Sequence, residues 1–307
     1  MTSPTNDTVL ILGGSGRFGR HATSAFAYHG WEVRQFDRAH DSLWDAAWGA
    51  KVIVNAWNPA YPDWATDLPR MTAEVIEVAK VSGATVLLPG NVYGYGPKAG
   101  PIWNEATPHL AKNLMGRLRV DMENAYKEAG VRTIILRCGD FIDTEQSGNW
   151  FDRIMISKLR RGHFVYPGAT DVRHAWAWLP DVADAAVALA ECRDSLPDFT
   201  DVPFEGYTLT ATEMRQSIEN VLGRPIKISK MNWLPLRVLA PFWKMAARLN
   251  EMRWLWNHPH QLDGTRLAEL APNLRATPVE EALSLALKLH IHPNQPVTAG
   301  TLRLTTE

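Results

Sequence analysis

A glycine-rich segment with the sequence GGSGRFG occupies residues 13–19 and limits the possible folds more than any other stretch. The run before it, 8–12, is short, apolar and rich in β-branched residues, as in a strand buried in a parallel sheet. Apolar residues from Phe18 to Phe26 then recur at helical spacing, and Gly30 marks the expected helix end. A strand, a glycine turn and a helix in this order predict a turn that binds the phosphates of a dinucleotide.

The glycines of this turn have a chemical reason. A pyrophosphate is bound by bare main-chain N–H groups and by the positive end of a helix dipole, so side chains at three of these positions would obstruct it. A second apolar run, 31–36, ends at Asp37, close to the roughly 20-residue spacing at which an acid binds the adenosine ribose. The candidate phosphate-binding residues are Gly13, Ser15, Gly16, Arg17, Phe18 and Gly19.

Two signals compete over which dinucleotide binds. The Asp37 carboxylate accepts both ribose hydroxyls and repels a 2′-phosphate, which favours NAD. Arg17 and Arg38 can clamp that phosphate, which favours NADP, but Arg38 can equally stack on adenine and Arg17 can be solvated. We expect NAD or NADP, with the carboxylate favouring NAD.

Beyond the turn, the sequence resembles a known group of enzymes. Gly13, Gly16 and Gly19 match the G-x-x-G-x-x-G of the short-chain dehydrogenase/reductase superfamily, and the chain is most similar to its extended branch, the NAD-dependent epimerase/dehydratase family. The similarity covers nearly the whole chain, with matching stretches at 52–56, 92–94, 135–137, 172–183 and 263–283. It implies further cofactor-binding positions at Asn55, Ala56, Trp57, Pro89 and Arg119.

Strand-like and helix-like patterns alternate along the chain, which predicts an α/β fold with a Rossmann-type doubly wound parallel sheet. We expect later strands at 31–36, 51–55, 84–88, 131–136 and 174–178, and helices at 41–48, 66–81, 113–129 and 181–192. A dinucleotide-binding domain would span 1–165, with 170–195 returning to it. A smaller, mostly helical substrate domain would span 196–307, with helices near 236–256 and 279–289, and 149–166 would help to cover the substrate.

The family's catalytic positions hold unusual residues here. The resemblance implies a Tyr and a Lys one helical turn apart, plus a Ser or Thr, yet none of the seven tyrosines has a lysine four places on. Met115, Arg119 and Pro89 occupy the Tyr, Lys and Ser/Thr positions. A thioether and a proline cannot transfer protons, whereas Arg119 can still hold ribose hydroxyls. The catalytic candidates are therefore Tyr93, Asn91 and Arg119, although Tyr93 can also simply pack the turn.

The substrate side is rich in aromatic residues. The chain has 13 Trp, of which Trp57, Trp103, Trp150, Trp176 and Trp178 fall near the expected crevice and suggest a flat or apolar ligand. Arg173 matches the arginine that holds the substrate diphosphate in nucleotide-sugar members, but it can equally form a surface ion pair, for example with Asp171. We expect His174 to be buried and hydrogen-bonded. The candidate substrate-binding residues are Tyr93, Met115, Trp150, Arg173 and Trp176.

Composition excludes several other classes of protein. A net charge of −1 gives no nucleic-acid footprint, and two cysteines cannot build a disulfide framework, so we expect a reducing cytoplasm and no nucleic-acid partner. The histidines lack metal-site spacing, so no metal is expected.

Residues 1–7 are expected to be a frayed leader, and no membrane span is expected. The mixed apolar and basic segment 236–256 suits a membrane-surface helix or a lid, and the family resemblance favours the lid.

Two functions remain open from the sequence. The first is an NAD(P)-dependent oxidoreductase or epimerase-like enzyme that acts on a small carbonyl, an alcohol or a nucleotide-sugar-like substrate with a non-standard site. The second is a non-catalytic NAD(P)-binding sensor or scaffold, which the loss of the catalytic residues favours. The resemblance also implies a possible homodimer through the helices near 66–81 and 113–129.

Overall fold

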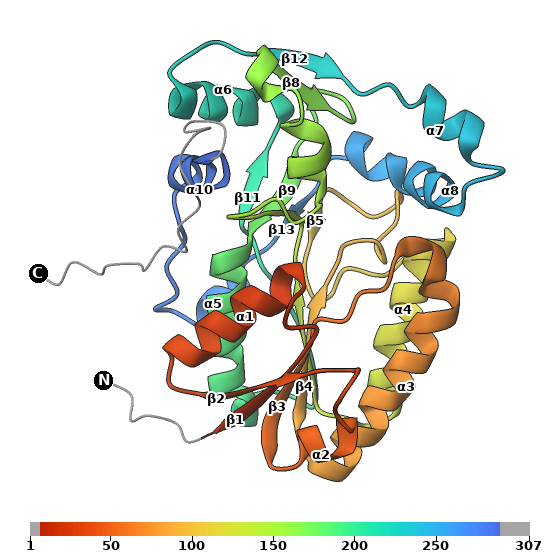
Figure 1. Ribbon diagram of the computed structural model, residues 1–307, viewed down its shortest axis with the longest axis vertical. Coiled ribbons are helices and arrows are strands. Elements are labelled where there is room, and N and C mark those ends of the chain that lie inside the picture. Colours follow the sequence, from red (N-terminus) through yellow and green to blue (C-terminus); the bar gives the residue numbers. More distant parts are fainter. Residues whose placement is uncertain (1–6, 289–307) are drawn as a thin grey trace, which may run out of the picture.

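The computed structural model describes residues 7–288, and a six-stranded parallel sheet forms its centre (Figure 1). The strand order is β10-β6-β4-β3-β1-β2, so the chain starts near one edge and builds outward in both directions from β1 and β3, as in a doubly wound fold. The strands of this sheet are β1 Thr8–Leu12, β2 Glu32–Phe36, β3 Ala50–Asn55, β4 Thr85–Gly90, β6 Thr133–Arg137 and β10 Phe199–Pro203.

Helices cover both faces of the sheet (Figure 1). One face carries α1 Arg17–Tyr28 and α5 Leu179–Glu191, which pack together. The opposite face carries α2 Leu43–Ala47, α3 Trp64–Ser82 and α4 Leu114–Glu128. The predicted helix stop is confirmed, since α1 ends at Tyr28 and Gly30 has a φ of +82°.

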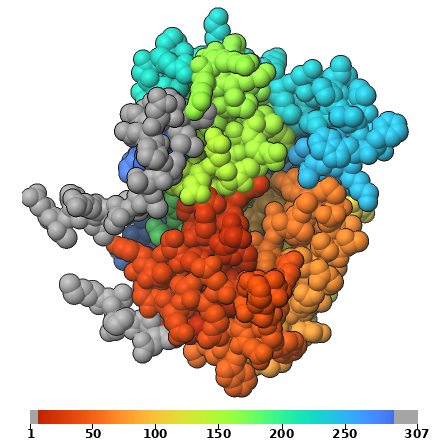
Figure 2. All heavy atoms as spheres, viewed as in Figure 1, coloured from red at the N-terminus to blue at the C-terminus, as the bar shows by residue number. Residues whose placement is uncertain are grey.

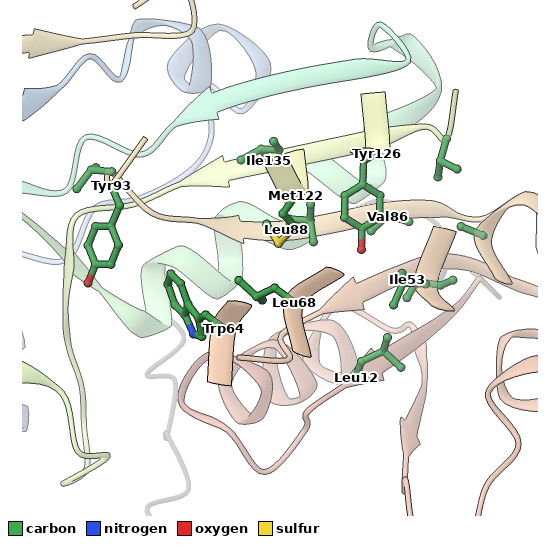
Figure 3. Close-up of a cluster of buried hydrophobic side chains, with 14 of the residues drawn as sticks. Leu12, Ile53, Trp64, Leu68, Val86, Leu88, Tyr93, Met122, Tyr126 and Ile135 are labelled. Carbon is green, nitrogen blue, oxygen red and sulfur yellow. The ribbon is translucent and has the colours of Figure 1, made fainter. Parts of the chain in front are cut away.

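The strands have apolar side chains on both faces, because each face is covered. In β1, Val9 and Ile11 belong to the core under α1 and α5, while Leu10 and Leu12 belong to the core under α3 and α4. Figure 3 shows this second core, with Tyr93 next to Trp64 at one end of the cluster. The core therefore reaches as far as the carboxyl ends of the strands.

A smaller part of the chain lies above that edge of the sheet in Figure 1. Its strands pair in three small sheets, β11-β9-β7, β12-β8 and β13-β5. They are β5 Ile102–Trp103, β7 Asp140–Ile142, β8 His163–Tyr166, β9 His174–Trp178, β11 Tyr207–Leu209, β12 Lys227–Lys230 and β13 Gln261–Leu262. Its helices are α6 Ala211–Leu222, α7 Leu234–Leu239, α8 Lys244–Glu251 and α10 Val279–Ala286. The helix α9 Thr265–Leu270 packs against α5 and β10 instead. Short helical turns along the chain are η1 Tyr61–Asp63, η2 Phe151–Met155, η3 Leu159–Arg161, η4 Arg193–Ser195 and η5 Met252–Asn257.

The α/β class and the doubly wound sheet predicted from the sequence are confirmed, but two elements differ. The 174–178 segment is a strand, yet it pairs with β7 and β11 instead of joining the main sheet, whose sixth strand is β10. The segment 236–256 is not one helix, because Pro241 lies between α7 and α8. The strand β10 lies within 196–307, the range expected for the substrate domain, yet it belongs to the main sheet. The boundaries of the two domains stay a prediction.

In the described part of the chain, no helix is both long enough and apolar enough to cross a bilayer.

Candidate functional site

A cleft of about 760 Å³ opens where the carboxyl ends of the main strands meet the smaller part of the chain. Its walls come from the turns after β1, β3, β4 and β6, which the parallel sheet brings to one edge. Most of the residues proposed from the sequence line it: Gly13, Ser15, Gly16, Arg17, Phe18, Arg38, Asn55, Ala56, Trp57, Pro89, Asn91, Tyr93, Arg119 and Trp150.

The glycine turn is shaped by close backbone approaches. Gly13 has a φ of +80°, and its carbonyl oxygen accepts a hydrogen bond of 2.9 Å from the N–H of Gly16. A Cβ on Gly19 would lie 2.0 Å from the same oxygen, so this residue lets α1 pack on the turn and does not itself line the cleft. Gly16 caps α1 with no side-chain hydrogen bond, which leaves the first-turn N–H groups available to an anion.

A loop at residues 143–149 crosses toward this turn and is fixed to α1 by three side chains. Arg17 donates hydrogen bonds of 2.8 Å to the backbone oxygens of Ser147 and Gly148. Arg20 and His21 both bind the Asp143 carboxylate, the latter at 2.9 Å. Arg17 therefore holds the loop over the turn, a role that the sequence did not indicate.

At the expected adenosine end of the cleft, Arg38 lines the cavity but the neighbouring Asp37 does not. The Arg38 guanidinium lies 4.5 Å from the centroid of the Trp57 ring and lines the cleft. Asp37 is exposed and does not line it, because its carboxylate accepts hydrogen bonds from the Ala39 N–H at 2.9 Å and from His40 at 2.7 Å. The hydrogen bond with Asp37 raises the pKa of His40.

Two tyrosine hydroxyls meet inside the cleft. The Tyr61 and Tyr93 oxygens are 2.6 Å apart, and both residues line the cavity. Burial raises the pKa of Tyr93 well above its ordinary value, and the charges of Tyr61 and Asp140 add to this effect. Burial also raises the pKa of Tyr61, against the hydrogen bond with Tyr93. Both phenols are therefore protonated at neutral pH. Sequence reasoning missed Tyr61, since only the fold brings η1 next to the turn after β4.

Arg119 lies beside this pair. Its guanidinium carbon is 4.1 Å from the centroid of the Trp64 ring, and Nη2 donates a hydrogen bond of 2.7 Å to the side-chain oxygen of Asn58. The Nε atom is buried without a hydrogen-bond partner. Burial lowers the pKa of Arg119, while its cation lowers that of Tyr93. A permanent cation with an unused donor thus faces the cleft next to the two hydroxyls.

A carboxylate and an imidazole form a second polar pair in the site. Asp140 lines the cleft and lies 2.7 Å from Nε2 of His174, which is buried and stacked on Trp256 at 4.4 Å. His174 is thus buried and hydrogen-bonded, as expected, and its Nδ1 atom has no partner. Asp140 lies three residues beyond the end of β6, at the start of β7, so its position shortly after a predicted strand could have identified it.

Three of the proposed substrate-binding residues do not line the cleft. Met115 is fully buried, and its N–H donates a hydrogen bond of 2.6 Å to Glu251. Arg173 is exposed and donates a hydrogen bond of 3.3 Å to the backbone oxygen of Thr208, with Glu213, not Asp171, 3.9 Å away. Trp176 is buried in an aromatic cluster with Trp256. Met115 at the start of α4 and Trp176 in β9 are buried behind the wall of the cleft, whereas Arg173 lies on the exposed surface outside it.

The one group of described residues with metal-like geometry is occupied by a cation of the protein. His109, Glu123 and Asp201 converge, but the buried Arg137 guanidinium binds both carboxylates. This arrangement is an ion-pair cluster, and no other group of three or more His, Cys, Asp or Glu side chains within residues 7–288 has metal-like geometry.

Comparisons with known proteins show the fold. No family model and no curated protein sequence matches the chain. Among solved structures, MoeE5 in complex with UDP-glucose and NAD matches with a TM-score of 0.72 and 14% identity, covering 94% of this chain and all of that one. L-threonine dehydrogenase from Phytophthora infestans matches with a TM-score of 0.71, 16% identity and coverages of 92% and 99%. The NAD-dependent NDP-hexosamine 5,6-dehydratase TunA matches with a TM-score of 0.70, 15% identity and coverages of 92% and 97%.

These likenesses confirm the predicted resemblance at the level of fold. The chain has the Rossmann-type fold of NAD-dependent epimerases and dehydratases over nearly its whole length.

Proposed function

We propose that this chain binds NAD or NADP in the cleft and catalyses an oxidoreductase or epimerase/dehydratase-like reaction on a small carbonyl, an alcohol or a nucleotide-sugar-like substrate. The observation that most directly supports this proposal is that one cleft contains both the glycine turn, where the α1 N-terminus has no side-chain cap, and the Tyr61–Tyr93 hydroxyl pair. The names of the structural neighbours, several of which were solved with NAD, support the same class of reaction.

The residues present fit a dinucleotide. The turn at Gly13 disfavours a side chain, because its φ is +80° and a Cβ there would lie 3.2 Å from the Ala56 oxygen. The α1 N–H groups beyond it have no side-chain cap. Gly13, Ser15, Gly16 and Phe18 would hold the phosphates, with Arg17 fastening the loop above them. When bound, the cofactor supplies hydride chemistry.

Tyr93 and Tyr61 would replace the missing Tyr-Lys dyad as the proton source. A phenol that stays protonated cannot act as a base, but it can protonate an alkoxide, because the alcohol that forms has a higher pKa still. Proton donation from Tyr93 would leave a phenolate, which the Arg119 cation stabilises by its charge. The protonated state of the two phenols thus suits protonation of the oxygen during reduction of a carbonyl. Asn91 holds the turn, since its side-chain oxygen accepts a hydrogen bond of 3.0 Å from the Tyr93 N–H.

The substrate would lie against the aromatic side chains of Tyr61 and Trp150. Asp140 is the acidic group at that end of the cleft, and its partner His174 can share a proton with it. A role for Arg173 in holding a diphosphate gains no support from its exposed position outside the cleft.

The same resemblance supports two further expectations. A homodimer would form through α3 and α4, which pack side by side on one face (Figure 1). A reducing compartment such as the cytoplasm suits Cys138 and Cys192, both of which are free thiols. Sedimentation of the purified protein and fractionation of cells test these expectations.

The test of the function is reduction of a panel of aldehydes and ketones with NADH and NADPH, followed by absorbance. Tyr93→Phe is expected to lower kcat by about 10²-fold or more with little change in NADH affinity, because it removes only the proton donor. Tyr61→Phe should have a smaller effect of the same kind. Tyr28→Phe, at an exposed site in α1, is the matched control and should change nothing.

A non-catalytic sensor or scaffold is the second candidate, and the absent Tyr-Lys dyad favours it. In that case the protein would bind NADH, measured by its fluorescence, and Tyr93→Phe would have no turnover to change. Tight NADH binding with no oxidation of NADH by any carbonyl of the panel would contradict the enzyme and leave the sensor.

A further inference from the structure

The α7–α8 region displays an unusual concentration of exposed apolar side chains. The described residues contain twelve large hydrophobic residues with an exposed side chain, and five of these lie within 234–243. Phe242 is the most exposed of all, at 90%. We call this the α7–α8 surface, and its apolar members are Leu234, Val238, Leu239, Phe242 and Trp243. Figure 2 shows the region in light blue, projecting at the upper right.

The inner side of the same region is firmly anchored. The buried Trp233 donates a hydrogen bond of 2.7 Å from Nε1 to the backbone oxygen of Pro167. Asn250 joins the two helices, because its side-chain nitrogen donates a hydrogen bond of 2.7 Å to the Leu236 oxygen in α7 and one of 2.9 Å to the Ala246 oxygen in α8. The exposed apolar residues are therefore held on a fixed outer surface and are not left over from loose packing.

Basic residues dominate the stretch of sequence that forms this surface. Between Glu219 and Glu251 the sequence contains six basic residues and no acidic one, although the whole chain has a net charge of only −1. Lys230, Arg237 and Lys244 are exposed and form no ion pair with any carboxylate in the described part of the chain. The six basic residues are Arg224, Lys227, Lys230, Arg237, Lys244 and Arg248.

We propose that the α7–α8 surface docks on an anionic membrane. Aliphatic, Phe and Trp side chains edged by Lys and Arg suit the boundary between acyl chains and anionic headgroups, where the rings insert and the cations bind phosphates. A second copy of this surface would bring the same positive charge, so charge complementarity favours an acidic lipid surface over self-association. A protein that lies on a bilayer in this way needs no membrane-spanning helix.

Docking would bring the membrane next to the wall of the cleft. The α8 helix packs against η1, the turn that carries Tyr61. At its end, the Glu251 carboxylate accepts hydrogen bonds from the Asn113 side chain at 3.0 Å and from the Met115 N–H at 2.6 Å. The surface is thus rigidly connected to both α4 and the hydroxyl pair, and this inference does not depend on which reaction the cleft performs.

Flotation of the full chain with vesicles tests the proposal. We expect binding to vesicles of phosphatidylcholine with phosphatidylglycerol, little binding to phosphatidylcholine alone, and release by high salt, because salt screens the cations. The double substitution Phe242→Ser with Trp243→Ser should weaken binding tenfold or more. Arg237→Gln and Lys244→Gln should each weaken it about fivefold.

Trp48→Ser is the matched control, since Trp48 is also an exposed tryptophan but lies at the end of α2, far from α7 and α8 (Figure 1). It should leave vesicle binding unchanged. The melting temperature of every variant should match that of the parent, which separates loss of docking from loss of folding. NADH binding should also match, which separates loss of docking from failure of the proposed function. Absence of binding to anionic vesicles at low salt would overturn the proposal. So would binding that survives the double substitution, or a self-associated form in solution that the same substitution dissociates.

Discussion

Arg137 donates a hydrogen bond of 2.6 Å from Nη1 to the backbone oxygen of Asn91 and so connects a buried ion cluster to the turn that carries Tyr93. The same guanidinium binds Glu123 of α4 and Asp201 of β10. Burial by itself lowers the pKa of Arg137, but the two carboxylates outweigh it and hold the pKa well above its ordinary value. The permanent cation of Arg137, a residue of β6, thus connects β10 and α4 with the turn after β4, which carries Tyr93.

Arg137→Met should destabilise the fold strongly. The substitution leaves the Glu123 carboxylate buried without its cation, and breaking a buried pair in this way costs about 3–5 kcal/mol. Urea denaturation followed by circular dichroism measures the loss. Arg132→Met is the control, because Arg132 is partly exposed and its pair with Asp194 is worth under about 1 kcal/mol. Equal losses for the two variants would contradict a special role for the cluster.

Asp143→Asn should remove part of the stability of the protein at neutral pH and not at acid pH. Burial by itself raises the pKa of Asp143, but hydrogen bonds from His21, Ser147 and Arg20 outweigh it and bring the pKa down to about 2. Because this folded-state pKa lies below the unfolded value, the stabilisation is complete above about pH 4 and is lost as the pH falls toward 2. A shift of this size corresponds to about 2 kcal/mol.

Denaturation curves of the parent and of Asp143→Asn between pH 2 and pH 7 make this comparison. The difference between the two proteins should be largest at pH 7 and should shrink toward pH 2. The variant should also bind NADH more weakly, because Asp143 fixes the loop at 143–149 to α1. A difference in stability that does not change with pH would show that the carboxylate is not the group responsible.

Gly16→Val and Gly19→Val should fail in different ways. A Cβ on Gly19 would lie 2.0 Å from the Gly13 oxygen, so Gly19→Val should lower the melting temperature markedly. A Cβ on Gly16 would meet only that oxygen, at 3.1 Å, so Gly16→Val should fold but obstruct the approach of a pyrophosphate. Calorimetric titration with NAD(H) and NADP(H) should detect no binding to folded Gly16→Val. Undiminished binding by this variant would remove the glycine turn from the proposed cofactor site.

The sequence alone was enough to predict the features that depend on local residue patterns. The glycine turn, its flanking strand and helix, and the convergence of Asn55, Asn91 and Tyr93 at one edge follow from a parallel sheet with one strand direction. Local pattern could not distinguish β9 from β10, because both are short buried strands and only their pairing partners differ. For the same reason it could not find Tyr61, whose importance depends on a contact with a residue 32 positions away.

The cofactor preference shows a different limit of the sequence. The position of Asp37 after β2 is as expected, but its carboxylate is turned into its own loop by Ala39 and His40, which a residue pattern does not encode. Binding of NAD would require this carboxylate to leave His40 for the ribose hydroxyls, whereas Arg38 already lines the cleft. The sequence therefore identifies the competing residues without fixing the balance between them.

Asp37→Ser should shift the preference of the protein from NADH toward NADPH. The substitution removes the charge that repels a 2′-phosphate and leaves Arg38 over Trp57, where it can bind that phosphate. We expect the ratio of the two dissociation constants, measured by cofactor fluorescence, to change by about tenfold. Asp45→Ser, at an exposed acid in α2, is the control and should change the ratio little. If the parent already prefers NADPH and Arg38→Gln abolishes that preference, Arg38 and not Asp37 determines which dinucleotide binds.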